Sequence, residues 1–428
     1  MGLMWRLVPR DDIGQMIKKL NILSSIFLRG GGAIFALFLQ IWIVKNYGGD
    51  NYGKYVLFLT VCSLLLIFSK SGVEVNVLKN TAINISNNKN TDGLLISGLV
   101  FVLITSVVVV SGVIYFDGLF GFYIADKKFG AINIWACVFF QCGYYVYLGW
   151  LRGARKFLKA DFLEMLVKNV LLFLVLYLAV FFGWGDNLIS FFVVSLLLFL
   201  VSVFLSSKVS IGKLDKSEFV MVGSKYFDFL ILGVTGFVFF QLDTLILGAY
   251  LSDFEVGAYN MVCNFVRLII FVPMVVASQM QPNAAAYYAQ GDYKKLTKIF
   301  VRALGVGVSS AVLAYLFLCI YGSNILGMVN EKYSFAVDVI YYLGAAHLVN
   351  SIVLITSSVL VVINKSRLAM LAQLVSGGVV FALYLLLIPI YGMVGAAISV
   401  FVGLIMVLFL YFASYLNGVR SAFRLPKV

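Results

Sequence analysis

The stretch SSIFLRGGGAIFALFLQIWIV, residues 24–44, is apolar over almost its whole length. As a helix rising 1.5 Å per residue, it is long enough to cross the roughly 30 Å of hydrocarbon in a bilayer. Arg29 and the three glycines Gly30, Gly31 and Gly32 interrupt it. The stretch therefore predicts a membrane-spanning helix that carries a permanent positive charge.

Apolar runs of this kind recur along the whole chain. Of its 428 residues, 62% are hydrophobic and 12% are charged, whereas about a quarter of the residues in a soluble domain are charged. Because lipid leaves no backbone group unsatisfied, runs of this length form helices. We expect an all-α integral membrane protein with about twelve transmembrane helices, at 20–44, 54–79, 91–115, 131–151, 160–182, 188–206, 226–250, 256–281, 297–320, 335–362, 368–388 and 393–416.

The sequence offers little for catalysis. The five cysteines lie inside apolar runs without the spacing of metal ligands. No nucleotide-binding loop or activated nucleophile is present in the pattern. We therefore expect no enzyme activity, no metal and no organic cofactor, and a nucleic-acid partner is not expected either.

The distribution of Lys and Arg predicts the orientation. If the N-terminus is cytoplasmic, 23 of the 32 cations fall in inner segments, 5 in outer segments and 4 within helices. Cytoplasmic loops carry the excess of Lys and Arg in membrane proteins. Both termini are therefore expected on the cytoplasmic side.

Two stretches far apart in the sequence resemble each other. KNYGGDNYGKYVLFLTV (45–61) introduces the second predicted helix and GAYLSDFEVGAYNMVCNFV (248–266) the eighth, each through a short outer loop that ends in Gly-x-Tyr. The loop at 206–225 divides the helices six and six. We expect two lobes, 1–210 and 211–428, related by a parallel pseudo-two-fold repeat around a central cavity, as in alternating-access transporters.

Longer motifs point to a family. QLDTLILGAYLSDFEVGAYNMVCNFVRLIIFVPMVVASQMQPNAAAYYAQGDYKKLTKIF (241–300) resembles the seventh-to-ninth helix region of Wzx-type polysaccharide flippases, in the superfamily of multidrug (MATE) exporters and lipid II flippases. The RGGG stretch at the N-terminus, LRGARKF after the fourth helix and IPIYGMVGAAIS before the twelfth fit as well. The matching residues of the main motif are Asp243, Leu247, Gly248, Val256, Gly257, Tyr259, Pro282, Gly291, Asp292 and Leu296.

The resemblance implies the cargo. It predicts transport of an undecaprenyl-diphosphate-linked oligosaccharide, an O-antigen or capsule repeat unit, from the cytoplasmic to the periplasmic leaflet of the bacterial inner membrane. The expected partners are this lipid-linked oligosaccharide and membrane lipids, while association with a polysaccharide polymerase and chain-length proteins stays open. A MATE-type drug or metabolite exporter is the alternative. A membrane polysaccharide polymerase is a further one, although the longest outer segment is only 116–130.

Four cations lie within the predicted helices, 8 to 14 residues from their inner ends. A cation at this depth, about 12 to 21 Å, is costly and normally faces a cavity or a partner. Arg29 and Arg267 have no acidic residue three or four positions away, so we expect them to bind the diphosphate, unless a carboxylate of another helix such as Asp243 pairs with them. A guanidinium suits this role because its fork matches the oxygens of a phosphate.

The two lysines have local alternatives. Lys70 and Lys168 are also candidates for the diphosphate, but Glu74 and Glu164 lie four residues away from them on the same helix faces. Ion pairs or snorkelling to the interface would explain both lysines without a substrate.

Asp243 and Glu74 are candidates for binding a coupling proton or sodium ion, with a salt bridge or hydrogen-bonded partner as the structural alternative for Asp243. Gly30, Gly31 and Gly32 would allow a bend or close helix packing. Pro273 is expected to kink the eighth helix.

Overall fold

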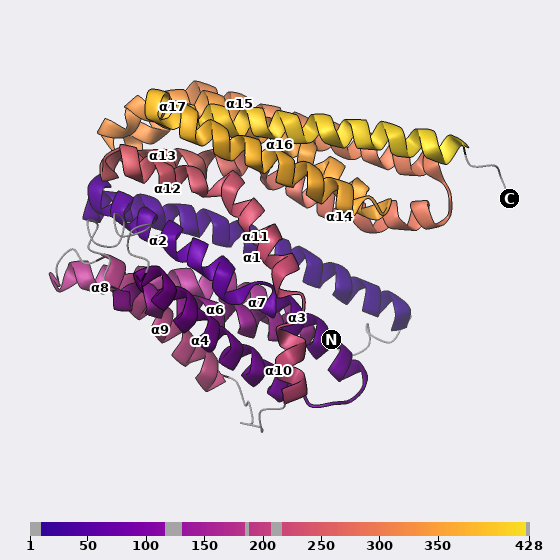
Figure 1. Ribbon diagram of the computed structural model, residues 1–428, viewed down its shortest axis with the longest axis horizontal. Helices are drawn as coiled ribbons and strands as arrows, with labels where there is room; N and C mark the ends of the chain where they lie inside the picture. The colour runs from indigo at the N-terminus through magenta and orange to yellow at the C-terminus, as the bar shows by residue number, and fades with distance from the viewer. Residues whose placement is uncertain (1–9, 116–130, 185–187, 207–215, 425–428) are drawn as a thin grey trace, which may run out of the picture. The chain divides into compact units, whose positions relative to one another are not determined.

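The computed structural model describes residues 10–115, 131–184, 188–206 and 216–424, and Figure 1 shows them as helices. These ranges contain no strand, and all twelve predicted apolar runs fall on helical segments. Nine helices in the described part are long and apolar enough to cross a membrane, and one of them, α17 (Ser366–Arg424), contains two predicted spans. The all-α membrane fold class is therefore confirmed.

The chain divides into two compact units. Unit 1 comprises Met1–Asn46 and Val61–Leu230, and unit 2 comprises Tyr47–Thr60 and Ile231–Val428. The second helix is shared, since its first half belongs to unit 2 and its second half to unit 1. The expected lobes 1–210 and 211–428, and their superposition, stay a prediction.

Unit 1 contains the helices of the first half of the chain. They are α1 (Arg10–Tyr47), the second half of α2 (Gly49–Lys70), α3 (Val73–Ser86), α4 (Asp92–Tyr115), α6 (Ala131–Gly153), α7 (Phe157–Phe162), the π-helical turn η2 (Leu163–Val167), α8 (Lys168–Phe181), α9 (Leu188–Ser206) and α10 (Lys216–Val222).

Small residues bring α3 and α6 into backbone contact. Gly149 and Gly153 form a Gly-x-x-x-Gly pair on α6. A Cβ atom at Gly149 would lie 2.4 Å from the carbonyl oxygen of Glu74, and one at Gly153 would lie 2.5 Å from that of Leu78. In lipid, where lipid tails are as apolar as the side chains, such close packing is a main force that holds helices together.

The segment after residue 215 stays with unit 1 because it is tied to α2 and α3. The Asn76 side-chain amide donates to the backbone carbonyls of Val222 and Ser224 at 2.8 and 2.6 Å. Val222 is the last residue of α10, where a helix leaves its carbonyl acceptors unsatisfied, and Ser224 lies in the turn that follows. The Tyr226 hydroxyl donates to the carbonyl of Phe68 in the last turn of α2.

Unit 2 contains the helices of the second half of the chain together with the first half of α2. They are most of α11 (Tyr226–Phe240), α12 (Leu242–Tyr250), α13 (Asp253–Val266), the 3₁₀ turn η3 (Arg267–Ile270), α14 (Phe271–Ala289), α15 (Tyr293–Val329), the 3₁₀ helix η4 (Glu331–Ala336), α16 (Val337–Val362) and α17. In Figure 1, α15, α16 and α17 run side by side. Gly392, with φ 55° and ψ −131°, separates the two spans of α17.

The Gly291–Asp292 motif builds the turn between α14 and α15. Gly291 has a φ of 71°, which favours glycine. The Asp292 side chain accepts a hydrogen bond from the backbone N–H of Lys295 and so caps α15. The hydrogen bond and positive charge of Lys295 lower the pKa of Asp292, which keeps the cap ionised.

The two Gly-x-Tyr stretches pack against each other in unit 2. A Cβ atom at Gly53 would lie 1.7 Å from the carbonyl oxygen of Asp253, and one at Gly257 would lie 2.9 Å from that of Gly49. Glycine is required at Gly53 because the obstacle is backbone, which a rotamer change cannot move. The similarity that the sequence shows therefore corresponds to a crossing of α2 and α13 at their N-terminal ends.

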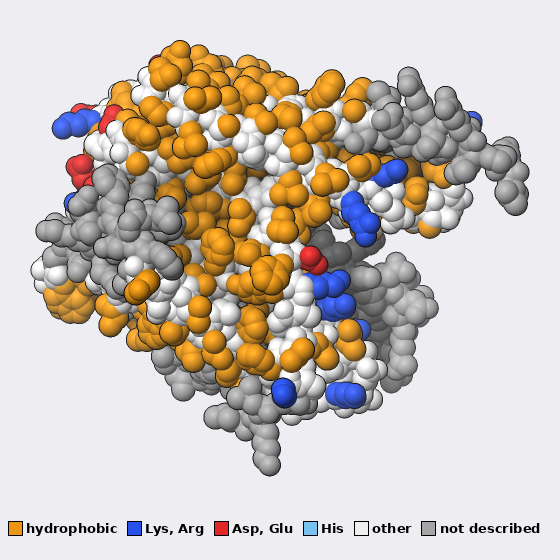
Figure 2. Space-filling view, viewed as in Figure 1, with side chains coloured by type: hydrophobic (Ala, Val, Ile, Leu, Met, Phe, Trp, Pro, Cys, Tyr) orange, Lys and Arg blue, Asp and Glu red, His pale blue; other side chains and the backbone are white. Residues whose placement is uncertain are grey.

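The surface is that of a membrane protein. Hydrophobic side chains are spread widely over the face shown in Figure 2, while Lys and Arg occur there in a few groups. Within single spans, Leu313, Ile320 and Phe409 are each about 70% exposed. Large apolar side chains exposed along whole helices are stable when lipid tails cover them.

Candidate functional site

Arg267 lies where the eighth predicted helix changes geometry. Helix α13 ends at Val266, the 3₁₀ turn η3 begins with Arg267, and α14 follows from Phe271. Pro273 lies in the first turn of α14 and has no N–H to donate to the carbonyl of Ile269 one turn before. The proline thus favours a break at the level of the arginine.

The Arg267 side chain is exposed and is not neutralised by a carboxylate in the described part of the chain. Its Nη1 donates to the Asn264 side-chain oxygen at 3.4 Å. Its charge lies within electrostatic range of Asp243 and of His347, the single histidine of the sequence. The guanidinium therefore keeps donors available for an anion.

Asp243 is buried in the first turn of α12, 4% exposed. One carboxylate oxygen accepts from the Tyr259 hydroxyl at 2.5 Å, and the other accepts from the backbone N–H and the hydroxyl of Thr244 at 2.7 and 3.3 Å. Three donors compensate part of the desolvation of a buried charge. Tyr259 belongs to the second Gly-x-Tyr motif, so this motif both packs on α2 and holds the carboxylate.

Lys70 lies in the last turn of α2, before the chain breaks at Gly72, which has a φ of 79°. Its Nζ lies 2.6 Å from the Glu74 carboxylate and 3.9 Å from the centre of the Tyr145 ring. The predicted pairing of Lys70 with Glu74 is present. A free Lys70 charge would require that this pair opens.

Lys168 differs from Lys70 because Glu164, the acidic residue four positions away, pairs with another residue. Glu164 pairs with Arg152, which also lies 3.4 Å from Asp161, so the expected Lys168–Glu164 pair is wrong. The π-helical turn η2 contains Glu164 and ends directly before Lys168. No ion pair or hydrogen bond of Lys168 occurs among the described residues, and its Nζ lies 5.7 Å from the Tyr144 ring centre.

Arg29 lies on α1, but its side chain is outside the described residues. The helix continues through Gly30, Gly31 and Gly32. A Cβ atom at Gly32 would lie 2.6 Å from the Cβ of Met165 in η2, whereas one at Gly31 would meet nothing within 4 Å. Gly32 thus packs α1 against the turn that precedes Lys168.

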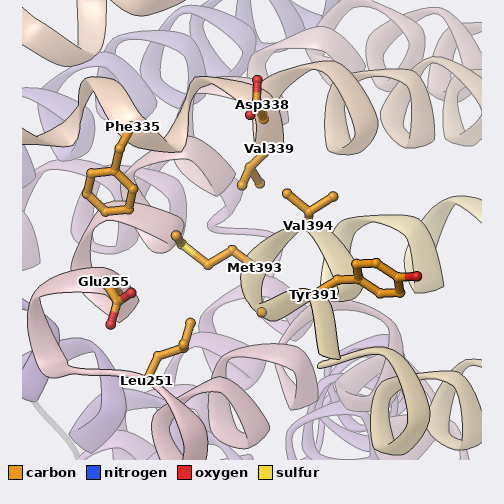
Figure 3. A pocket seen from close by; sticks show the side chains of 9 residues that line it. Leu251, Glu255, Phe335, Asp338, Val339, Tyr391, Met393 and Val394 are labelled. Atoms are coloured by element: carbon orange, nitrogen blue, oxygen red, sulfur yellow. The ribbon is translucent and has the colours of Figure 1, made fainter. Parts of the chain in front are cut away.

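Unit 2 also has a small pocket of about 190 Å³, shown in Figure 3. Met393 of α17 lies between Phe335 and Leu251, and Glu255, Asp338 and Tyr391 are on the rim (Figure 3). Sites for organic ligands commonly have about 300 to 1,000 Å³. The pocket is too small for an oligosaccharide, so we do not place the cargo there.

Sequence reasoning missed three polar residues around Arg267, namely Tyr52, Asn260 and Asn264. A signal for two of them was present, because Asn260 and Asn264 are spaced four apart in an apolar helix and so share one face. The Tyr52 contact joins residues 208 positions apart in the sequence. No local pattern reveals a contact of that kind.

Two family models match the chain. The model described as polysaccharide biosynthesis protein matches residues 21–281, and the model described as MatE matches residues 234–386. The first covers Arg29, Lys70, Asp243 and Arg267. A curated relative, the probable low-salt glycan biosynthesis flippase Agl15 of Haloferax volcanii, is 21% identical over 171 residues, which are 40% of this chain and 36% of that protein. The match thus spans about a third of the relative's length.

Solved structures share the fold. The lipid II flippase MurJ in an inward closed conformation has a TM-score of 0.73 at 15% identity, over 92% of this chain and 87% of that one. An inward-facing MATE-family multidrug resistance transporter of the MOP superfamily has a TM-score of 0.70 at 12% identity, over 94% of this chain and 100% of that one. At these identities the likeness shows the fold alone.

Proposed function

Because this chain belongs to the polysaccharide biosynthesis protein family, we propose that it is a flippase for undecaprenyl-diphosphate-linked oligosaccharide. It moves an O-antigen or capsule repeat unit from the cytoplasmic to the periplasmic leaflet of the bacterial inner membrane. Both termini lie in the cytoplasm. The chain carries out transport and no covalent chemistry.

The observation that supports this function is the exposed Arg267, which has no carboxylate partner among the residues that the structure describes. A buried or membrane-embedded cation is normally paired, so an unpaired guanidinium in an apolar helix favours an anionic ligand. A diphosphate offers oxygens at the spacing of the guanidinium fork. In unit 1, Arg29, Lys70 and Lys168 remain candidates for binding the diphosphate, as the sequence predicts.

A MATE-type exporter of cationic drugs or metabolites is the second candidate. The MatE model match over residues 234–386 and the buried carboxylate of Asp243 favour it. The two candidates require opposite charges at the cargo site. An exporter of cations would bind its cargo through carboxylates, and the arginines would repel it.

The experiment that separates the candidates is a competition for the purified protein in detergent. We expect undecaprenyl-diphosphate-linked oligosaccharide to bind and undecaprenyl diphosphate to displace it, because the diphosphate is the shared group. A cationic dye should displace neither. Two outcomes would favour the exporter. In the first, the dye binds and undecaprenyl diphosphate displaces it poorly. In the second, the lipid does not bind at all.

We further propose that Asp243 binds the coupling ion, a proton or sodium ion, with Glu74 as a second candidate. Asp243→Asn keeps the size and most hydrogen bonds but cannot exchange a proton and loses the negative charge that attracts sodium. The mutant should still bind undecaprenyl diphosphate while its transport no longer responds to an ion gradient. Asp338→Asn, at an exposed carboxylate of the same unit, is the control and should keep the response. If Asp243→Asn still transports in response to an ion gradient, Asp243 does not bind the coupling ion and its role is structural.

A further inference from the structure

A chain of hydrogen bonds leads from helix α2 to Arg267. The Tyr52 hydroxyl donates to the Asn260 side-chain oxygen at 3.0 Å. The Asn264 side-chain nitrogen donates to that same oxygen at 3.1 Å and to the Tyr52 hydroxyl oxygen at 3.4 Å. The Asn264 oxygen accepts from Arg267 Nη1 at 3.4 Å. All four side chains belong to unit 2.

This chain fixes which end of the Asn264 amide faces Arg267. An amide has a donating nitrogen and an accepting oxygen, and it can rotate to exchange them. Two oxygens, those of Tyr52 and Asn260, hold the nitrogen of Asn264 on one side. Its oxygen must therefore point to the other side, where it can accept from the guanidinium. If the Asn264 amide were flipped, its NH2 group would face the N–H groups of the Arg267 guanidinium, and no hydrogen bond could form between them.

Tyr52, at one end of this chain of hydrogen bonds, is held in a fixed position. Its side chain is 1% exposed. It precedes Gly53, whose contact with the backbone of Asp253 leaves no room for α2 to shift toward α13. The hydroxyl is therefore held at a fixed place relative to Asn260 and Asn264. The bond to Asn264 uses only Nη1 of the guanidinium, so the remaining donors of Arg267 can be aimed at a ligand.

We propose that Tyr52, through Asn260 and Asn264, is a positioning residue that orients Arg267 for bidentate binding of the diphosphate. The inference rests on the proposed function, in which Arg267 binds this group. A bidentate contact depends on orientation, whereas a simple charge attraction does not. Loss of the Tyr52 hydroxyl should therefore reduce diphosphate binding without removing any charge.

The test is a double-mutant cycle on purified protein, with undecaprenyl diphosphate and undecaprenyl monophosphate as probes. Tyr52→Phe should weaken diphosphate binding roughly 2- to 10-fold, the range that one hydrogen bond supplies, and should weaken monophosphate binding less. In an Arg267→Ala background the same change should have no further effect, because the group that Tyr52 orients is absent. Asn264→Asp should weaken binding more, since its carboxylate would pair with Arg267.

Tyr411→Phe is the matched control. Tyr411 is fully buried in unit 2, and its hydroxyl donates to the backbone carbonyl of Ala369, so the change removes the same atom without touching Arg267. It should leave both affinities unchanged, and the melting temperatures of both Tyr→Phe variants are compared to detect loss of folding.

Equal weakening by Tyr52→Phe with and without Arg267, or unchanged binding in Tyr52→Phe, would overturn the positioning role. If Arg267→Ala itself binds the diphosphate like the wild type, the proposed role of Arg267 fails and the positioning role with it. The two failures are therefore told apart by the single Arg267→Ala measurement.

Discussion

We expect Arg267→Ala to abolish transport of the lipid-linked oligosaccharide while the protein still folds, inserts and reaches normal abundance. This is the expected result because the side chain is exposed and forms no ion pair with a carboxylate among the described residues, while the buried Asp243 keeps its hydrogen bonds from Tyr259 and Thr244. When the cargo is bound, the proposed charge pair is Arg267 with the diphosphate. Loss of one partner of a desolvated charge pair typically costs about 2 to 5 kcal/mol. Arg29→Ala should have the same effect. Two measurements test both variants, namely the affinity of the purified protein for undecaprenyl diphosphate and the restoration of surface polysaccharide in cells.

Two further variants make this prediction specific. Arg267→Lys should restore transport only in part, because lysine supplies the charge without the bidentate fork. Lys70→Gln is the matched control, since its charge already lies 2.6 Å from Glu74. It should be milder than either arginine variant. Wild-type affinity and full complementation by both arginine-to-alanine variants would mean that the arginines are structural.

Gly53→Ala should destabilise the protein strongly, by about 3 kcal/mol or more, because overpacking against backbone is costly and cannot be relieved by a rotamer change. The added Cβ would lie 1.7 Å from the Asp253 carbonyl oxygen, so α2 and α13 would have to separate. The separation would also displace Tyr52 from Asn260. Thermal unfolding of the purified protein in detergent measures the effect.

Gly305→Ala is the control for this substitution. A Cβ there meets nothing within 4 Å, and the residue lies inside helix α15. Alanine has the higher helix propensity by about 1 kcal/mol, so stability should stay equal or rise. Equal melting temperatures for the Gly53→Ala variant and the wild type would show that the α2–α13 crossing is not a tight contact.

The positions of the helices could be predicted from hydropathy, but their breaks could not. The predicted run 54–79 is interrupted at Gly72, and the run 226–250 is interrupted at Gln241. Hydropathy averages over a window and does not respond to a single non-helical residue, such as the left-handed Gly72 (φ 79°) or Gln241 with φ −147° and ψ −24°. The break at Arg267 had a local signal, because Pro273 lacks the N–H that a continuous helix would need.

The charged residues within the helices could be found from the sequence, but the partners they pair with could not. A spacing of four residues correctly indicates the Lys70–Glu74 pair. The same spacing is wrong for Lys168 and Glu164, because Arg152 from another helix binds Glu164 first. Local spacing lists the partners that a helix offers, while tertiary packing selects among them. Tyr52 escaped prediction for the same reason.

The repeat shows what similarity between segments can and cannot reveal. The sequence shows that the two Gly-x-Tyr stretches resemble each other, but only the structure shows that they pack together. Gly53 and Gly257 are glycines because each faces the backbone of the other helix. Tyr259 additionally holds Asp243, whereas the hydroxyl bound to Asn260 in the α2 copy is that of Tyr52, one residue before Gly53. The two motifs therefore make different contacts in the structure.

Leaflet-resolved digestion of the cargo decides whether this chain is a flippase. Purified protein is reconstituted into vesicles that carry undecaprenyl-diphosphate-linked oligosaccharide in both leaflets, and an added glycosidase that cannot enter digests only the outer-leaflet sugar. With the wild-type protein and an ion gradient, we expect sugar from the inner leaflet to become accessible as well, and with Arg267→Ala we expect only the outer-leaflet fraction to be digested. If the wild-type protein leaves the inner-leaflet sugar protected, as in vesicles without protein, while it transports a cationic dye, the flippase function is contradicted.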